Sequence, residues 1–122
     1  MKIFLVEDGE GVRGQIASLL GQVAGAQVVG FASTASEAIE GVRELLPDVV
    51  VLDLGLRLGV GQDVLRELKP LFGRVNFVVF TNSVDEVTVR HCIELGALAV
   101  LDKSTQIEQL FEVVNGLRKG EN

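Results

Sequence analysis

Five short apolar runs alternate with five stretches of helical periodicity, and this alternation constrains the fold more than any other feature of the sequence. The runs predict strands, which we expect at residues 3–6, 27–31, 49–52, 76–80 and 99–101. The first run is continuously apolar, which is typical of a strand that helices cover on both faces, and the third run is the richest in β-branched residues. Strict alternation of strand and helix favours a parallel sheet with right-handed crossovers.

The stretches between the runs carry helix signals. Thr34 and Glu37 form the pattern of a capping box at the start of the second helix, and Pro47 marks the end of that helix. Thr105 and Glu108 form the same pattern before the last helix. Apolar residues at helical spacing predict the buried faces of the first and last helices. They are Val12, Ile16, Leu19, Leu20, Val23, Ile107, Leu110, Phe111 and Val114.

The predicted architecture is an α/β fold of the flavodoxin-like kind, (βα)5. It has a doubly wound five-stranded parallel sheet in the order 2-1-3-4-5. Two helices would cover one face of the sheet and three the other. The chain has 122 residues, the size of one ordinary domain, and 48% of them are hydrophobic. We therefore expect one domain over residues 1–122, with a core that needs no disulfide or structural metal.

The charge balance narrows the classes of partner. Asp and Glu outnumber Lys and Arg by 17 to 11, and the net charge is −6. A domain that binds nucleic acid by itself normally presents a basic face, so direct nucleic-acid binding is not expected. No apolar run approaches the ~20 residues that span a bilayer. Because Glu7 and Asp8 come too early for a signal peptide, we expect a cytoplasmic protein without membrane contact.

Polar residues that can do chemistry follow four of the predicted strands. Glu7 and Asp8 follow the first strand, Asp53 the third, Thr81 the fourth and Lys103 the fifth. The carboxyl ends of parallel strands meet at one edge of an open sheet, where ligands bind. Carboxylates gathered there repel one another, and a hard divalent cation is their natural counter-charge. Any one of these acids alone is ordinary loop chemistry, but the whole set predicts a site for a metal and an anion.

This constellation resembles the receiver domains of response regulators in two-component signalling. The resemblance runs from Lys2 to about Leu117, and the order and spacing of the motifs make it specific. The motifs that carry it are Val6-Glu7-Asp8, residues 47–54 around Asp53, Phe80-Thr81-Asn82-Ser83, Leu95-Gly96-Ala97 and Leu101-Asp102-Lys103-Ser104.

The resemblance implies a role for each residue of the set. Asp53 would accept the phosphoryl group from a phosphohistidine, Thr81 would donate its hydroxyl to that group, and Lys103 would pair with the phosphoryl oxygens. A carboxylate is a workable covalent acceptor, and phosphoryl transfer needs mainly positioning and charge neutralisation. The implied ligands of a magnesium ion are three carboxylates and one backbone carbonyl, those of Glu7, Asp8, Asp53 and Gly55.

The resemblance also implies the partners. A histidine kinase or a phosphotransfer protein would supply the phosphoryl group. A downstream protein would bind the face made by the fourth helix, the fifth strand and the fifth helix, with Val84 and Val87 as candidate contacts. The chain ends just after the last predicted helix, which fits a stand-alone, chemotaxis-type receiver or a receiver without its effector domain. Whether phosphorylation drives homodimerisation stays open.

The expected activity is that of a phosphoacceptor and not of a classical enzyme. Gly55, two residues after Asp53, and Ser83, two residues after Thr81, leave the predicted site open to water. We therefore expect the phosphorylated form to lose its phosphoryl group by itself and to be short-lived.

Four positions depart from the pattern of the family. Val100 stands where many receivers have an aromatic residue, so an aromatic switch is in doubt. Ser104 stands where many have a proline joined by a cis bond, and the isomer of the Lys103–Ser104 bond stays open. Arg57 replaces a frequent proline in the loop after the phosphoacceptor, and Glu7 replaces the commoner aspartate.

Three other functions are weaker alternatives. The departures at Val100 and Ser104 keep open a pseudo-receiver, a protein-interaction module that is never phosphorylated. Residues 9–14 fit the G-x-G-x-x-G fingerprint of dinucleotide-binding proteins, but two acids precede it and no acid ends the second strand. A phosphatase similar to the haloacid dehalogenases would need a second acid two residues after Asp53, where Gly55 stands.

Overall fold

The computed structural model describes residues 1–82 and 84–120. Five parallel strands form one sheet in the order β2-β1-β3-β4-β5. The strands are β1 (Lys2–Val6), β2 (Gln27–Ala32), β3 (Val49–Leu52), β4 (Asn76–Thr81) and β5 (Ala99–Asp102). The predicted flavodoxin-like fold and its strand order are confirmed, and each strand lies within one residue of its expected bounds.

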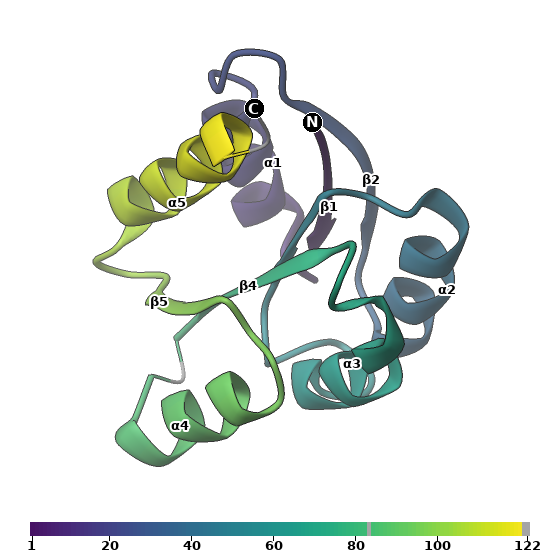
Figure 1. The fold of residues 1–122 in the computed structure, drawn as a ribbon. Coiled ribbons are helices and arrows are strands. Elements are labelled where there is room, and N and C mark those ends of the chain that lie inside the picture. The colour runs from purple at the N-terminus through teal and green to yellow at the C-terminus, as the bar shows by residue number, and fades with distance from the viewer. Residues whose placement is uncertain (83, 121–122) are drawn as a thin grey trace.

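Helices cover both faces of the sheet (Figure 1). One face carries α1 (Glu10–Leu20) and α5 (Ile107–Gly120), as expected for two of the five helices. The other face carries α2 (Ala35–Leu45), α3 (Gly61–Glu67) and α4 (Glu86–Glu94). A single turn of 3₁₀ helix, η1 (Lys69–Leu71), links α3 to β4.

The core has two layers because successive side chains of a strand point to opposite faces. In β1, Phe4 and Val6 pack under α2 and α3, whereas Ile3 and Leu5 pack under α1 and α5. All four residues of β3 are buried, because helices cover both faces of the sheet. The sheet is therefore a rigid platform whose strand ends are fixed relative to one another.

The starts of α2 and α5 test the two predicted capping boxes. The Thr34 side chain caps α2 by accepting a hydrogen bond of 3.2 Å from the Glu37 N–H, as the predicted capping box requires. The second predicted box is wrong, because α5 begins at Ile107 and Thr105 lies before its flanking residue. Gln106 takes that flanking position, and its side-chain oxygen accepts a 2.8 Å bond from the Asp102 N–H.

Two residues predicted to be buried are partly exposed. Val12 is 38% exposed and Ile107 is 40% exposed. Both lie in the first turn of their helix, at the edge of the sheet where the helices start. Helical spacing predicts which face of a helix turns inward, but it does not predict how far the helix extends beyond the layer beneath it.

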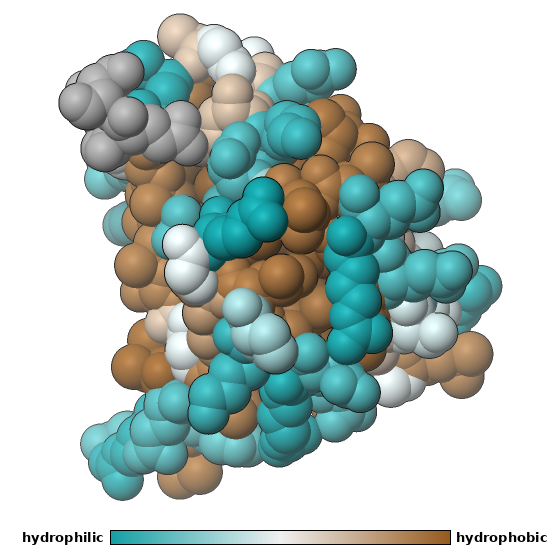
Figure 2. Space-filling view, turned by 45° about the vertical axis from the view of Figure 1, so that its right-hand side comes forward, coloured by the Kyte–Doolittle hydropathy of each residue, from teal (hydrophilic) through white to brown (hydrophobic). Residues whose placement is uncertain are grey.

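One face of the molecule shows an apolar area framed by hydrophilic side chains (Figure 2). This is the side of Figure 1 on which α2 and α3 lie. A shallow groove here is lined mainly by α2, with Asp63 contributed by α3. Within the described part of the chain, no helix has both the length and the apolar character needed to cross a bilayer.

Candidate functional site

The carboxyl ends of the three central strands and of β5 bring the predicted site residues together. Glu7 directly follows β1, Asp53 follows β3, Thr81 ends β4 and Lys103 follows β5. Carboxylate oxygens of Glu7, Asp8 and Asp53 all lie within 4.8 Å of one another. Asp8 is exposed, whereas Glu7 and Asp53 are buried. The acidic cluster is therefore open to solvent on one side and enclosed on the other.

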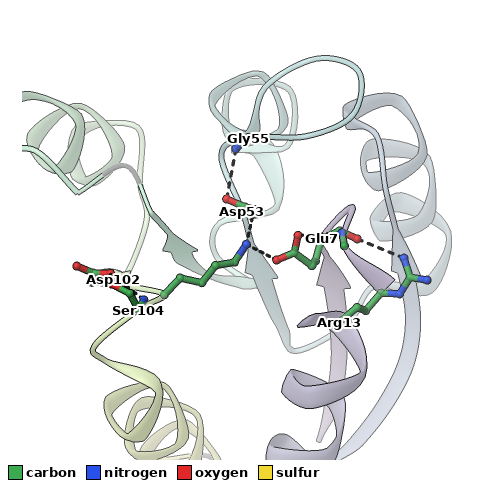
Figure 3. A network of polar contacts seen from close by, with 8 residues as sticks. Glu7, Arg13, Asp53, Gly55, Asp102 and Ser104 are labelled. Atoms are coloured by element: carbon green, nitrogen blue, oxygen red, sulfur yellow. Dashed lines mark hydrogen bonds and ion pairs between the residues drawn. The ribbon is translucent and has the colours of Figure 1, made fainter. Parts of the chain in front are cut away.

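Lys103 is the central cation of this cluster. Its Nζ atom lies 2.7 Å from Asp53 Oδ2 and also contacts Glu7 Oε1. Figure 3 shows the carboxylates of Asp53 and Glu7 directed toward the same point from neighbouring strands. The three side chains are 14%, 9% and 4% exposed, in the order Lys103, Asp53 and Glu7, so solvent screens these ion pairs weakly.

Main-chain N–H groups hold the two buried carboxylates in place. The Gly55 N–H donates to Asp53 Oδ1 over 3.3 Å, and the Gly9 N–H donates to Glu7 Oε2 over 3.1 Å. Each bond reaches back two residues from a loop, as in the local turns that Asp and related side chains favour. One oxygen of each carboxylate is thus engaged by its own loop, while the other faces Lys103.

The pKa shifts follow from this arrangement. Burial raises the pKa of Glu7 above its usual 4.5, and the charge of Asp53 adds to the rise, although Lys103 and the Gly9 N–H oppose it. Burial works to lower the pKa of Lys103, but its hydrogen bonds with Asp53 and Glu7 outweigh burial and raise that pKa. Two carboxylates stabilise the charged form of Lys103, whereas Glu7 and Asp53 share one ammonium. Three carboxylates around one ammonium leave the cluster short of positive charge.

The donor set suits a hard divalent cation. Carboxylate oxygens are the ligands that magnesium prefers, and it usually keeps several waters in addition. Glu7 Oε1 is buried and pairs with the ammonium of Lys103, which it shares with Asp53 Oδ2. Three carboxylates with one shared ammonium fit the predicted magnesium site.

Thr81 lies beside this cluster at the end of β4. Its side chain is buried, and its carbonyl oxygen accepts a hydrogen bond of 3.0 Å from the Lys103 N–H. The residues that carry the predicted hydroxyl and ammonium are therefore linked through the main chain. Asn82 is exposed, and Ser83 lies outside the described residues.

Ser104 has a structural role in the loop after β5. Asp102 Oδ1 accepts a hydrogen bond of 2.8 Å from the Ser104 N–H and another of 2.7 Å from its hydroxyl. These bonds lower the pKa of Asp102. A proline has no N–H and could not donate the first of them. Asp102 and Ser104 lie apart from Asp53 and Glu7 (Figure 3), and no peptide bond between described residues is cis.

Arg13 is a contributor that the sequence did not reveal. Its Nη1 atom donates to the Glu7 carbonyl oxygen over 3.2 Å and to Ser33 Oγ over 3.3 Å. Its guanidinium carbon lies 4.1 Å from the centre of the Phe31 ring. An arginine in the first turn of an amphipathic helix is ordinary in sequence, so only the fold shows that it contacts the end of β2.

Other sequence signals have structural roles. Gly9 flanks α1, Gly11 and Gly14 lie within it, and the carboxylates of the acidic cluster directly before the helix would repel a pyrophosphate. Cys92 is fully buried in the core, and burial raises the pKa of its thiol. Val100 is half-buried against the core beneath α2, α3 and α4.

The chain is similar to known proteins over almost its whole length. The family model described as "Response regulator receiver domain" matches residues 3–115. LiaR, a transcriptional regulatory protein of Bacillus subtilis (strain 168), is 29% identical over 121 residues, which are 99% of this chain and 57% of LiaR. The chain thus spans less than two thirds of that relative.

Two solved structures extend the comparison. The phosphorylated cyanobacterial phytochrome response regulator RcpA is 32% identical, with a TM-score of 0.78, and the match covers 97% of this chain and 91% of RcpA. The Mn(2+)-bound form of the response regulator Rcp1 is 28% identical, with a TM-score of 0.77 and coverages of 96% and 91%. Both similarities extend over almost the whole chain.

Proposed function

Because this chain belongs to the response regulator receiver domain family, we propose that Asp53 is its phosphoacceptor in a two-component system. The phosphoryl group comes from the phosphohistidine of a histidine kinase or of a phosphotransfer protein. The observation that carries the proposal is the position of the Lys103 ammonium, 2.7 Å from Asp53 Oδ2 and in contact with Glu7. A cation held at this place can neutralise charge on an incoming phosphoryl group.

The chemical step needs little from the protein besides positioning. An oxygen of the Asp53 carboxylate attacks the phosphorus atom, a new O–P bond forms, and the N–P bond to the imidazole breaks with its electron pair going to nitrogen. Asp53 Oδ1 is held by the Gly55 N–H and Oδ2 by Lys103, so the nucleophile is oriented before the donor arrives. An acyl phosphate on Asp53 is the product.

Magnesium is the proposed cofactor. Glu7, Asp8 and Asp53 would bind it through their carboxylates, and Gly55 would contribute its carbonyl oxygen. The bound ion would supply positive charge to the phosphoryl oxygens. The support is the acidic cluster, in which oxygens of three carboxylates lie within 4.8 Å of one another and two of the carboxylates share the ammonium of Lys103. A divalent cation is also known in a relative, since Rcp1 has a Mn(2+)-bound form.

The proposed relay uses the residues next to Asp53. Phosphorylation adds about −1.5 to −2 charges and three strong acceptors. Thr81 and Lys103 are positioned to respond, and the hydrogen bond between their main chains joins the ends of β4 and β5. The proposed reader of this change is a downstream protein on the face of α4, β5 and α5. Val87 on that face is 74% exposed and Val84 is half-buried.

Loss of the phosphoryl group by hydrolysis belongs to the same proposal. Gly55 is exposed, and a Cβ atom built on it meets nothing within 4 Å, so water can reach the Asp53 side of the site. Residues 1–122 are proposed to form one receiver domain. LiaR, a longer relative, is named as a transcriptional regulator, and a similar output for the protein that contains this chain is part of the proposal.

Intact-mass measurement after incubation with acetyl phosphate and MgCl2 tests the proposal. We expect the mass of one phosphate to be gained by the wild type, lost in Asp53→Asn, and retained in Asp63→Asn. Asp63 is a matched control because it is an exposed aspartate in the first turn of α3, outside the cluster. If the wild type gains no phosphate, the phosphoacceptor proposal fails and the pseudo-receiver alternative takes its place.

A further inference from the structure

Arg13 joins three segments that surround the acidic cluster. Its guanidinium donates to the carbonyl oxygen of Glu7 and to the hydroxyl of Ser33, and it lies over the ring of Phe31. The first contact is to the loop after β1 and the other two are to β2 and the residue that follows it. Figure 3 shows Arg13 on the opposite side of Glu7 from the carboxylate cluster.

The contact with Glu7 fixes a residue whose side chain is part of the cluster. The Glu7 N–H donates to the Ala32 carbonyl over 3.0 Å, continuing the pairing of β1 with β2. Its carbonyl oxygen accepts from Arg13 over 3.2 Å. Both polar groups of this peptide segment are thus engaged, which restricts the rotation of the main chain that carries Glu7 and, one residue later, Asp8.

Ser33 extends the same restraint to the loop after Asp53. Its carbonyl oxygen accepts a hydrogen bond of 3.2 Å from the Arg57 N–H, and the neighbouring Ala35 N–H donates to the Leu58 carbonyl over 3.0 Å. The loop that begins after Asp53 is therefore fastened to the residue whose hydroxyl Arg13 holds. Arg13 is thus joined directly to the loop after β1 and, through Ser33, to the loop after Asp53.

We infer that Arg13 is a positioning residue that holds the loops bearing Glu7, Asp8 and Asp53 in the geometry that binds a divalent cation. The inference rests on the proposed function for the identity of the cation. Partners of this kind, which orient metal ligands without touching the metal, commonly change metal affinity by about tenfold or more when they are removed. The aromatic contact with Phe31 helps to keep the long Arg13 side chain in one orientation.

Charge and positioning predict opposite effects for a substitution at Arg13. Arg13→Met removes a positive charge from the surroundings of a cation site, so electrostatics alone would tighten the binding of Mg²⁺. Loss of positioning would weaken that binding, because the carboxylates must then be ordered when the ion arrives. The sign of the change in Kd therefore separates the two explanations.

Amide NMR titration of the full chain with MgCl2 measures the Kd of each variant. The chain has no Trp or Tyr whose fluorescence could report binding. We expect Arg13→Met to raise the Kd for Mg²⁺ by about three- to tenfold and Ser33→Ala, which removes no charge, by about twofold. Arg13→Lys keeps the positive charge but not the forked pair of N–H donors. Its Kd for Mg²⁺ should lie between those of the wild type and Arg13→Met. Arg74→Met, an exposed arginine at the far end of β4, is the matched control.

The outcomes are distinct. An Arg13→Met protein that binds Mg²⁺ as well as the wild type, or more tightly, overturns the inference and leaves the proposed function standing. If Arg13→Met lacks a dispersed spectrum, Ser33→Ala decides, and an unchanged Kd in that variant overturns the inference. If the wild type itself shows no shifts near Glu7, Asp8 and Asp53, the inference and the proposed magnesium site fail together.

Discussion

The ammonium of Lys103 lies 2.7 Å from Asp53 Oδ2, although their strands β5 and β3 are separated by β4. Because the same nitrogen contacts Glu7 after β1, one side chain joins the ends of three strands. Without a metal ion, Lys103 is therefore the group that counters the repulsion between Glu7 and Asp53.

Replacing Lys103 should destabilise the metal-free protein. Lys103→Met leaves two buried carboxylates facing each other, and breaking such a pair costs about 2 kcal/mol or more of unfolding free energy. Urea unfolding in the presence of a chelator measures this loss. Lys69→Met, at an exposed position in η1, should change the unfolding free energy by less than about 0.5 kcal/mol.

Added magnesium should recover part of the loss in Lys103→Met, since an ion that binds only the folded state stabilises it by about 2.7 kcal/mol at a hundredfold excess over Kd. If Lys103→Met is as stable as the wild type in chelator, the ammonium does not offset the repulsion of the carboxylates.

The raised pKa of Glu7 predicts a dependence of stability on pH. Between the unfolded value near 4.5 and the higher native pKa, the folded protein binds more protons than the unfolded chain. Stability then falls as the pH rises through this window and becomes level above the native pKa. Glu7→Gln cannot ionise, so its unfolding free energy relative to the wild type should increase from pH 4.5 toward neutrality.

Urea unfolding of both proteins across this pH range, without divalent cations, measures the difference. Acidic groups outside the cluster titrate alike in both proteins and cancel from the comparison. A difference that stays constant, or that decreases as the pH rises, would mean that burial does not raise the pKa of Glu7.

The cap of α2 should make a measurable contribution to stability. Thr34 is buried, and its hydroxyl accepts from the Glu37 N–H at the first turn of the helix. Thr34→Ala removes this acceptor and should cost about 1 kcal/mol, which corresponds to a decrease in Tm of about 4 °C for a domain of this size. Thr34→Ser retains the acceptor and should recover most of the decrease in a thermal melt.

Alanine substitutions at two glycines should have opposite effects. Gly96 has a φ of 110°, and an added Cβ would lie 2.0 Å from a ring carbon of Phe72. Gly96→Ala should therefore cost about 2 kcal/mol or more. Gly14 lies inside α1 with no atom within 4 Å of an added Cβ, so Gly14→Ala should stabilise the protein by about 0.5–1 kcal/mol. Chemical denaturation measures the change in unfolding free energy of each variant relative to the wild type, which should be a loss for Gly96→Ala and a gain for Gly14→Ala.

The fold and the position of the site were predictable because both depend on short-range patterns. Continuous apolar runs fixed the strands, and the polar residue after each run marked one edge of the sheet. Parallel pairing then required Glu7, Asp53 and Lys103 to converge, which the structure shows. No contact between distant side chains had to be inferred for this result.

Contacts that depend on the relative placement of elements were not predictable. Nothing in the sequence indicates that Arg13 reaches Phe31 and Ser33, because α1 and the end of β2 approach each other only in the folded protein. The exposure of Ile107 was missed for a similar reason. Helical periodicity gives a direction around the helix axis, but not the extent of the surface that covers the helix.

Access of water at Gly55 should limit the lifetime of the phosphorylated form. Gly55 is exposed two residues after Asp53, and an added Cβ atom meets no atom within 4 Å. A larger residue can therefore be placed at this position without moving its surroundings, and the backbone carbonyl proposed as a magnesium ligand is retained. Gly55→Met should shield the acyl phosphate from water and lengthen its half-life by about threefold or more, a change of roughly 0.7 kcal/mol in the barrier to hydrolysis.

The decay is followed by intact mass after removal of acetyl phosphate, with magnesium kept constant. Gly73→Met is the matched control, because Gly73 is also exposed and unhindered but lies in the turn before β4, at the opposite edge of the sheet. Its half-life should equal that of the wild type. If Gly55→Met decays as fast as Gly73→Met, water reaches the phosphoryl group by a route that the side chain at position 55 does not cover. A wild-type half-life of many hours would contradict the open site itself.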